Sequence, residues 1–386
     1  MKVKRSFFIG ISSLLLNAMP TYAAPPQIVS AYISAALKSD GTIWAWGDSC
    51  GSNVAGQLKD STNKSLSNVK GISNSGYYGV LAINGDGTLS SLSGCGKWKD
   101  TWQPVKDSAG KLVTNVVQAS GGGNTAFVKE DGTVWNFGGN DYGQLGTGQV
   151  GGSSAAAVQV KVSATTFLTG VKSVRVGEIQ SIALKKDGTV WIWGYSWMYP
   201  GNYYAIQVKD NKGTPITNVD SIGMGGQGVF HIIKNDGSLW AVDVRFGGGG
   251  YPIQYKNGTP LTDFTVVDGT DMYGCAAGIA VHSSGNVWQW ACSPMLYDAS
   301  NSYPAFQVKT DSSTYLADVK TVAGTIYNTL ALKNDGTVWQ WGTGKQGMST
   351  PPGGHVASQV MDMSGKPLRL IGDAVCYPSF SDIKTR

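Results

Sequence analysis

The chain has 386 residues, and only 14% of them are charged, against roughly 25% in an average soluble domain. Hydrophobic residues make up 41% and Gly occupies 53 positions, so the composition excludes wholesale disorder and favours short strands joined by many turns. The formal net charge is +5, but three basic residues precede residue 6. Without them 27 basic residues face 25 acidic ones, which removes the main support for a nucleic-acid-binding protein.

The first 23 residues have the layout of a secretory signal peptide. Lys2, Lys4 and Arg5 precede an apolar run over residues 7–16, and small residues follow around Ala23. The run is shorter than the roughly 20 apolar residues that a membrane-spanning helix needs, and no later segment is long enough to span a bilayer. We therefore expect cleavage near Ala23, a secreted or periplasmic location, and no membrane span.

One repeated phrase dominates the rest of the chain. Residues 36–47 read Ala-Leu-Lys-Ser-Asp-Gly-Thr-Ile-Trp-Ala-Trp-Gly, and residues 183–194 and 331–342 repeat this phrase with few changes. Four weaker copies follow the same plan. A period of this length is typical of repeat architectures such as propellers. The central glycines of the seven copies are spaced by 45 to 56 residues, at Gly41, Gly87, Gly132, Gly188, Gly237, Gly285 and Gly336.

Each copy is predicted to form a β-hairpin. Asp-Gly between two apolar runs favours a tight turn, because Gly accepts the positive φ that the turn requires and Asp can bond its own backbone. The strand after the turn is apolar at neighbouring positions, such as Val190 and Trp191, so it must be covered on both faces. A closed ring of stacked blades provides this cover. We therefore predict an all-β, seven-bladed propeller, formed as a single domain by residues 24–386.

A second phrase lies between the hairpins. It spans residues 105–116, 208–219 and 308–319, and we interpret it as an outer strand, a turn and the first strand of the next blade. The last version, residues 360–371, follows the seventh hairpin and has no eighth hairpin to feed. We expect this C-terminal segment to complete the first blade and thereby close the ring.

The hairpin phrase resembles the repeats of the regulator of chromosome condensation family. Residues 140–146, Asn-Asp-Tyr-Gly-Gln-Leu-Gly, also match that family's Asn-x-x-Gly-Gln-Leu-Gly phrase. The resemblance covers nearly the whole mature chain, and it implies a seven-bladed propeller without implying one function. Copies two and five depart from the phrase, because Ser90, Leu92 and Val242 stand where the family has tryptophans.

The sequence contains no convincing catalytic or metal-binding motif. The histidines are His231, His282 and His355, and their places in the repeat do not correspond, so we interpret the first two as strand residues with satisfied hydrogen bonds. An aspartate precedes six of the seven turn glycines. These aspartates lie on separate hairpins, so we interpret them as turn residues rather than as a metal or acid cluster. We expect no enzyme activity, no metal and no cofactor.

Aromatic residues outside the hairpin phrase are the candidate binding residues. Ten of the thirteen tryptophans occupy the two repeat positions, and we predict that they are core residues. Rigid rings with a polar tip in loops contribute contact area at low entropic cost, so they suit protein recognition. The predicted partner-binding residues are Trp98, Trp102, Trp197, Tyr199, Tyr203, Tyr204, Tyr273 and Tyr327.

The five cysteines are compatible with disulfides, since an exported protein meets an oxidising compartment. Residues facing each other across the turn at Gly285 should have numbers that sum to about 568 by the pairing of an antiparallel hairpin. Cys275 and Cys292 satisfy this condition, and we predict a disulfide between them. Cys50 could pair with Cys95 in the next blade or with Cys376 in the C-terminal segment.

These features favour a monomeric, secreted or periplasmic propeller that binds another protein. Enzyme inhibition by occlusion is one form of this function, and the chain is similar in size, export and repeat count to the propeller-type β-lactamase inhibitor proteins. Two alternatives stay open. The first is a lectin or adhesin in which the same aromatics stack on sugar rings. The second, implied by the resemblance, is a host-directed exchange factor for a small GTPase.

Overall fold

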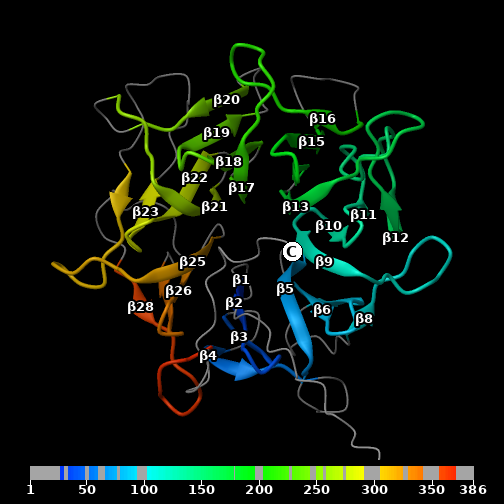
Figure 1. The fold of residues 1–386 in the computed structure, drawn as a ribbon. Coiled ribbons are helices and arrows are strands. Elements are labelled where there is room, and N and C mark those ends of the chain that lie inside the picture. The colour runs from blue at the N-terminus through cyan, green and yellow to red at the C-terminus, as the bar shows by residue number, and fades with distance from the viewer. Residues whose placement is uncertain are drawn as a thin grey trace, which may run out of the picture.

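The structure is a computed structural model of the 386-residue chain. It describes residues 27–29, 34–47, 52–59, 66–75, 79–93, 102–177, 179–195, 203–225, 228–243, 249–254, 258–272, 275–290, 305–324, 329–341 and 356–370. The described residues form seven four-stranded antiparallel sheets arranged around one axis (Figure 1). They contain no helix, so the predicted all-β, seven-bladed propeller is confirmed.

Each sheet is built from four consecutive strands, numbered from the axis outward. The innermost strands are β1 (Gln27–Val29), β5 (Val69–Ser75), β9 (Val116–Gly121), β13 (Val171–Val176), β17 (Val219–Met224), β21 (Phe264–Met272) and β25 (Val319–Gly324). The second strands are β2 (Ser34–Leu37), β6 (Gly79–Asn84), β10 (Asn124–Lys129), β14 (Gln180–Lys185), β18 (Val229–Lys234), β22 (Cys275–His282) and β26 (Thr329–Lys333). The third strands are β3 (Ile43–Gly47), β7 (Leu89–Ser93), β11 (Val134–Gly139), β15 (Val190–Gly194), β19 (Leu239–Asp243), β23 (Val287–Trp290) and β27 (Val338–Trp341). The outermost strands are β4 (Ser52–Gln57), β8 (Gln103–Pro104), β12 (Ser153–Gln159), β16 (Ile206–Gln207), β20 (Gly249–Pro252), β24 (Phe306–Gln307) and β28 (Ser358–Gln359).

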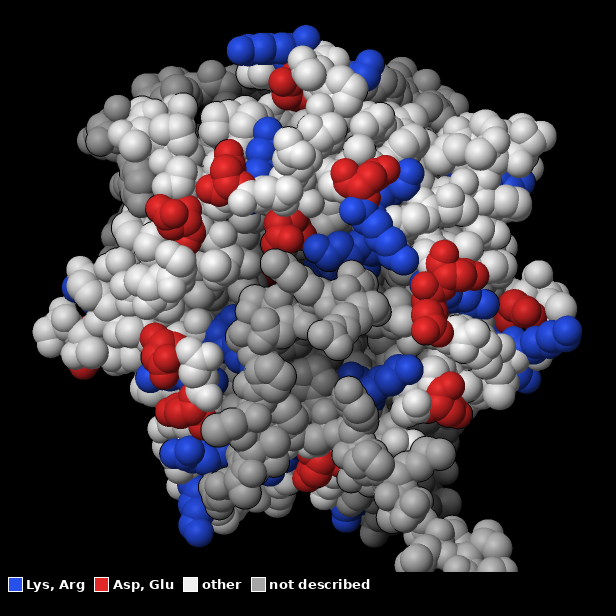
Figure 2. All heavy atoms as spheres, in the orientation of Figure 1, with Lys and Arg blue, Asp and Glu red and all other residues white. Residues whose placement is uncertain are grey.

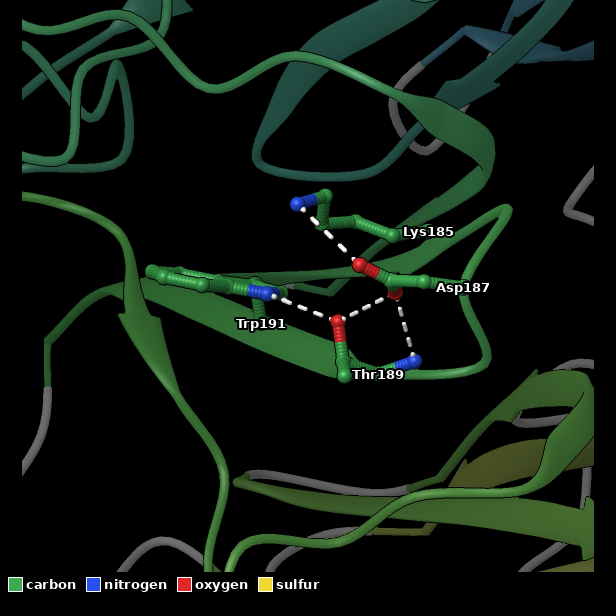
Figure 3. A network of polar contacts seen from close by, with 4 residues as sticks. All are labelled: Lys185, Asp187, Thr189 and Trp191. Atoms are coloured by element: carbon green, nitrogen blue, oxygen red, sulfur yellow. Dashed lines mark hydrogen bonds and ion pairs between the residues drawn. The ribbon is translucent and has the colours of Figure 1, made fainter.

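The Asp-Gly turns connect the second and third strands of every blade, as the repeat predicts. All seven turn glycines have φ between 77° and 83°, in the region that side chains rarely adopt. In the fourth blade the Asp187 carboxylate accepts hydrogen bonds from the backbone N–H and the hydroxyl of Thr189, at 3.0 and 2.6 Å (Figure 3). The same hydroxyl accepts the indole N–H of Trp191 at 3.1 Å, and Lys185 lies over the ring. The repeated phrase therefore encodes a self-contained turn.

Consecutive blades are joined by a repeated pair of backbone hydrogen bonds. At the junction of blades two and three, the N–H of Val116 donates to the carbonyl of Gly87, and the N–H of Glu130 donates to the carbonyl of Asn115. Asn115 has φ of 58°, a left-handed conformation that Asn, Asp and Gly tolerate better than other residues. The residues in this position with positive φ are Asn68, Asn115, Gly170, Asn218, Asp263 and Asp318.

The C-terminal segment closes the ring with the same contacts. The N–H of Leu370 donates to the carbonyl of Gly336 at 2.9 Å, and the N–H of Ser39 donates to the carbonyl of Leu370 at 3.0 Å. Nearby, the indole N–H of Trp46 in blade one donates to the side-chain oxygen of Gln340 in blade seven at 3.1 Å. The predicted closure by the C-terminal segment is therefore confirmed.

One detail of the predicted closure is wrong. Residues 360–370 do not supply a strand to the first blade, because β1 to β4 already form a four-stranded sheet from residues near the N-terminus. The C-terminal segment instead follows β28, the outermost strand of the seventh blade. It reaches the first blade through turn and loop contacts, including the hydrogen bond from the N–H of Ala55 to the carbonyl of Met361.

Apolar side chains of neighbouring blades pack against each other around the ring. Between blades four and five, Ile182 and Leu184 form one buried cluster with Ile222, Phe230 and Ile232. Other described blade junctions carry similar clusters. Each strand face is therefore covered by the next blade, which is the arrangement that the two-sided apolar strands predict.

The tryptophans of the repeat divide into two classes, contrary to the prediction that all are core residues. The second tryptophan of the phrase is buried, as in Trp46, Trp193 and Trp341, which are 2 to 5% exposed. The first is only partly buried, as in Trp191. It lies close to the turn, where its indole bonds the Thr or Ser hydroxyl and a Lys side chain covers the ring in five blades.

Several predictions concern residues outside the described part of the chain. The signal peptide, residues 1–23, lies there, as do Cys50, Cys95, Cys292 and Cys376. Cys275 begins β22, but its predicted disulfide with Cys292 stays a prediction. Within the described residues, no helix has the length and apolarity needed to cross a bilayer.

Candidate binding face

The antiparallel sheets give the ring two different ends. The Asp-Gly turns and the blade-to-blade linkers lie at one end, which we call the turn face. The connections from first to second strand and from third to fourth strand lie at the other end, which we call the loop face. This division follows from the strand order alone, because successive antiparallel strands end at opposite edges of a sheet.

Charged residues are segregated to the turn face. Every described Lys lies in a turn, a linker or a strand end at this face. Figure 2 shows one face of the ring, where basic and acidic side chains lie intermixed from the rim towards the centre. The described part of the loop face contains the acidic residues Asp141, Asp243 and Asp271, and Arg175 on the innermost strand β13 is the described basic residue that lies nearest to it.

A tyrosine cluster lies on the loop face at the junction of blades three and four. We use this name for Tyr142, Tyr195, Tyr203 and Tyr204. The rings of Tyr142 and Tyr195 meet edge to face with centroids 5.8 Å apart, and Tyr142 is 46% exposed. This T-shaped arrangement is the favourable geometry for an aromatic pair. The cluster therefore presents preformed aromatic surface to solvent.

Glycines in the loop between β11 and β12 make room for the other two tyrosines. A Cβ atom at Gly143 would lie 2.3 Å from Cδ1 of Tyr203, and one at Gly148 would lie 2.2 Å from the ring of Tyr204. The backbone N–H of Gly148 also donates to the carbonyl of Tyr203 at 3.2 Å. The two rings thus pack directly on the loop backbone, and a side chain at either glycine would displace them.

The loop that carries Tyr142 is held by two buried amide side chains. The Asn140 side chain accepts the N–H of Leu145 and donates to the carbonyls of Gln149 and Gly151. The side-chain oxygen of Gln144 accepts the N–H of Tyr142 at 2.9 Å. These bonds fix the loop backbone, so Tyr142 is displayed from a rigid support.

The structure describes three of the eight predicted partner-binding residues. Tyr203 and Tyr204 belong to the tyrosine cluster. Trp102 is partly buried and packs, with Leu58, against the apolar cluster between blades one and two, which favours a packing role over contact with a partner. The predicted residues outside the described part of the chain are Trp98, Trp197, Tyr199, Tyr273 and Tyr327.

Sequence reasoning missed Tyr142 as a binding residue. It lies within the Asn-x-x-Gly-Gln-Leu-Gly phrase, which was interpreted only as a sign of the fold. The available signal was its neighbourhood, because a tyrosine beside two glycines in a long connection is a surface ring with little to cover it. Tyr195 was already apparent as part of the aromatic connection after the fourth hairpin.

The axis of the ring contains a buried carboxylate. Asp268 on β21 accepts the N–H of Met224 on β17 at 3.3 Å and the N–H of Gly324 on β25 at 3.2 Å, so it links blades five, six and seven. Burial raises the pKa of the Asp268 carboxyl above its usual value, and the positive charge of Arg175 and the backbone donors oppose this rise. The geometry is that of a structural clamp on the inner strand edges.

The two described histidines have structural environments. His231 is 1% exposed, its ring nitrogen lies 3.1 Å from the carbonyl of Met224, and its ring packs edge to face on Trp290. Burial lowers the pKa of His231 to about 4. His282 bonds Ser284 within its own hairpin turn. Both environments agree with the interpretation of these residues as satisfied strand residues.

Turn aspartates likewise serve the backbone. The pKa of Asp187 lies below its usual value, chiefly because the Thr189 hydroxyl donates to the carboxylate. The pKa values of Asp86 and Asp131 are lowered by the same contact in their own turns. Among the described residues, no group of three or more metal-ligating side chains comes together.

Comparison with known proteins identifies the repeat. No protein-family model matches the chain. A segment of 102 residues is 36% identical to the E3 ubiquitin-protein ligase HERC2 of Homo sapiens, covering 26% of this chain and 2% of HERC2. Another match, over 174 residues, is 27% identical to the regulator of chromosome condensation of Mus musculus, covering 42% of this chain and 38% of that protein. The chain thus matches less than two thirds of the length of either relative.

Solved structures share the fold at low sequence identity. Human WBSCR16 superimposes with a TM-score of 0.54 at 15% identity, over 83% of this chain and 84% of that chain. Yeast RCC1 (Prp20), solved in complex with Kap60, superimposes with a TM-score of 0.50 at 13% identity, over 88% and 86% of the two chains. This chain is therefore a seven-bladed propeller built from repeats homologous to those of the regulator of chromosome condensation.

Proposed function

We propose that this chain is an exported propeller that binds another protein through its loop face and acts by covering the partner's working surface, without catalysis of its own. An enzyme inhibitor that acts by occlusion is the form of this function that we favour. The observation that carries the proposal is the division of the ring into a charged turn face and a loop face with few charges and exposed tyrosines.

The chemistry of the loop face supports protein recognition. Buried centres of protein interfaces are depleted in charged residues and enriched in Tyr and Trp. Tyr142 and Tyr195 provide ring area with hydroxyl groups at its edge, and the loop beneath them is fixed by the side chains of Asn140 and Gln144. Because little motion is lost on binding, a preorganised surface of this kind retains more of its contact energy.

Related propellers and the N-terminal sequence support the same proposal. Yeast RCC1, which shares the fold, was solved bound to the protein Kap60. The signal-like segment at residues 1–23 favours a partner outside the cytoplasm, either in the periplasm or in the medium. A periplasmic or extracellular enzyme is therefore the kind of partner that we expect.

Capture from exported proteins with matched variants tests the proposal. Residues 24–386 are immobilised and exposed to a periplasmic and secreted extract, beside the double variant Tyr142→Ala/Tyr195→Ala and the turn-face control Lys111→Ala/Lys212→Ala. All three chains are first shown to have the same thermal unfolding midpoint. The proposal predicts a protein that the wild type and the control retain and the tyrosine variant loses.

Calorimetry with that purified protein should then show an affinity at least about tenfold weaker for the tyrosine variant, since loss of two interface rings costs well over 1.4 kcal/mol. Equal retention by all three chains would exclude the tyrosine cluster as the binding site. Loss of binding by the turn-face control alone would place the partner on the opposite end of the ring.

A lectin or adhesin is the second candidate, and the same observation supports it. Exposed tyrosine rings also stack on sugars, and the scarcity of charge on the loop face suits a neutral glycan. A glycan array with wild type and the Tyr142→Ala/Tyr195→Ala variant separates the two functions. Saturable sugar binding that the variant loses would favour the lectin, whereas an exchange factor would show nucleotide release from a small GTPase and no sugar binding.

A further inference from the structure

A small buried polar site lies between blades three and four, beneath the tyrosine cluster. Three side-chain oxygen atoms there are buried and have no hydrogen-bond partner among the described residues: Oδ1 of Asn124, Oδ1 of Asn136 and Oγ of Ser181. The three residues are 4%, 0% and 0% exposed. Burying such atoms without a partner is unfavourable, so native proteins rarely contain them.

The three side chains project from facing blades into one apolar cluster. Asn124 lies on the same face of β10 as Ala126, and Asn136 lies on the same face of β11 as Val134. Ala126 and Val134 belong to the apolar cluster that blades three and four share. Both amides therefore point towards blade four.

Ser181 points back from blade four towards the same region. It pairs across the sheet with Trp193 and also with Val176, and directly paired residues share one face. Trp193 and Val176 both belong to the shared cluster. The backbones meet beside this position, since the N–H of Gly123 donates to the carbonyl of Gly177 at 2.9 Å.

The orientation of the two amides is set by one carbonyl group. The backbone oxygen of Gln144 accepts Nδ2 of Asn124 at 3.2 Å, Nδ2 of Asn136 at 2.9 Å and Nε1 of Trp193 at 2.9 Å. Rotating either amide by 180° would place two oxygen atoms against each other, so the network fixes the assignment. Both Oδ1 atoms consequently face away from Gln144 and need donors.

We propose that one internal water molecule occupies this site. A water donates two hydrogen bonds and can accept others, so one molecule satisfies both Oδ1 atoms and accepts the hydroxyl of Ser181. A cation would meet three neutral oxygen atoms within an apolar cluster, with no carboxylate to balance its charge, and that arrangement is unfavourable. The site also completes the support of Gln144, and thereby holds the loop that carries Tyr142.

A crystal structure at about 1.8 Å resolution tests the proposal directly. The expected result is a single peak of solvent density at hydrogen-bond distances, about 2.7–3.2 Å, from all three oxygen atoms. A peak at shorter cation distances, or a site closed by rotated side chains with no peak, would overturn the proposal.

The variant Ser181→Ala provides an independent test whose sign decides the question. If the hydroxyl bonds a water, its removal breaks that bond, and the unfolding equilibrium constant rises about fivefold, the effect of one hydrogen bond. If the hydroxyl is unpaired, alanine removes a buried polar group and the urea midpoint rises instead. The exposed Ser108→Ala is the control and should leave the midpoint unchanged.

Hydrogen exchange shows whether the site also holds the loop. In Ser181→Ala the amides of Tyr142 and Leu145 should exchange faster than in the wild type, because the Gln144 support is weakened. The amide of Gly110, in a turn at the opposite face, should exchange at the wild-type rate. Unchanged exchange at Tyr142 and Leu145 would refute the role of the water in holding the loop. These readouts do not involve the partner, so they can fail or succeed independently of the proposed function.

Discussion

Replacing Thr189 with Val tests whether the Asp-Gly-Thr turn contributes to the stability of a blade. Valine keeps the shape of threonine but lacks the hydroxyl. The substitution removes the 2.6 Å bond to the Asp187 carboxylate and the 3.1 Å bond from the Trp191 indole, both drawn in Figure 3. The backbone bond from Thr189 to Asp187 does not depend on the hydroxyl and should persist.

The expected cost follows from these two bonds. A hydrogen bond to a charged group contributes about 1.5–3 kcal/mol, and a neutral bond contributes about 0.5–1.5 kcal/mol. The side chain of Asp187 is 54% exposed, so solvent weakens the first bond and the low end of each range applies. We therefore expect the free energy of unfolding to fall by about 2 kcal/mol.

Urea denaturation measures this change, with Thr114→Val as the control because Thr114 is exposed in a linker. The Thr189 hydroxyl lowers the pKa of Asp187, so the stability that it contributes is present above about pH 4 and is lost as the pH falls through the folded-state pKa. The difference between variant and wild type should therefore be larger at pH 7 than at pH 3. NMR titration should show the pKa of Asp187 moving up, towards its usual value, in the variant.

An equal effect of the two valine substitutions would refute this reasoning. The turn would then be determined by the glycine alone, and the repeated threonine would need another explanation. A difference that does not depend on pH would instead assign the effect to the Trp191 contact and exclude the carboxylate as its source.

Three other changes should have separable effects. Gly269→Ala places a Cβ 1.8 Å from the carbonyl oxygen of Met224 and should lower the free energy of unfolding by about 3 kcal/mol in thermal denaturation, whereas Gly139→Ala, whose nearest listed contact is 3.8 Å away, should be nearly neutral; equal effects would contradict the tight approach of the inner strands. His231 titrates near pH 4 when folded and near 6.5 when unfolded, so stability should fall by about 3 kcal/mol as the pH drops from 6.5 to 4, and urea midpoints of His231→Gln should lose this dependence. Leu370→Ala removes a buried side chain at the ring closure and should cost about 3 kcal/mol with faster proteolysis near the closure; wild-type proteolysis rates would exclude a closing role for that side chain.

The sequence predicted the elements whose physics is local. Asp-Gly turns, flanked by strands apolar on both sides, determine hairpins and blade stacking without reference to distant residues. The closure was predicted in kind but not in detail, because the repeat does not reveal which terminus supplies a strand. Residues 27–29 were too short a segment to identify as the innermost strand of the first blade, yet the structure places β1 there.

The candidate site was only partly predictable. Aromatic residues in long connections indicated Tyr203 and Tyr204, but their packing on Gly143 and Gly148 depends on contact between two loops from different blades. Asp268 carries no repeat signal, since equivalent positions in other blades have other residues. Its role as a clamp appears only when three inner strands are brought to one axis.

The bonds that join Ser39 to Leu370 have a consequence for synthesis and export. A chain that emerges N-terminus first has to present nearly its whole length before the first and seventh blades can meet. Until then the apolar side of the first blade, including Ala36 and Trp46, has no cover from the seventh. The partly made protein thus depends on chaperones or on rapid delivery across the membrane, and a C-terminal truncation that removes Leu370 would leave every nascent chain in that exposed state.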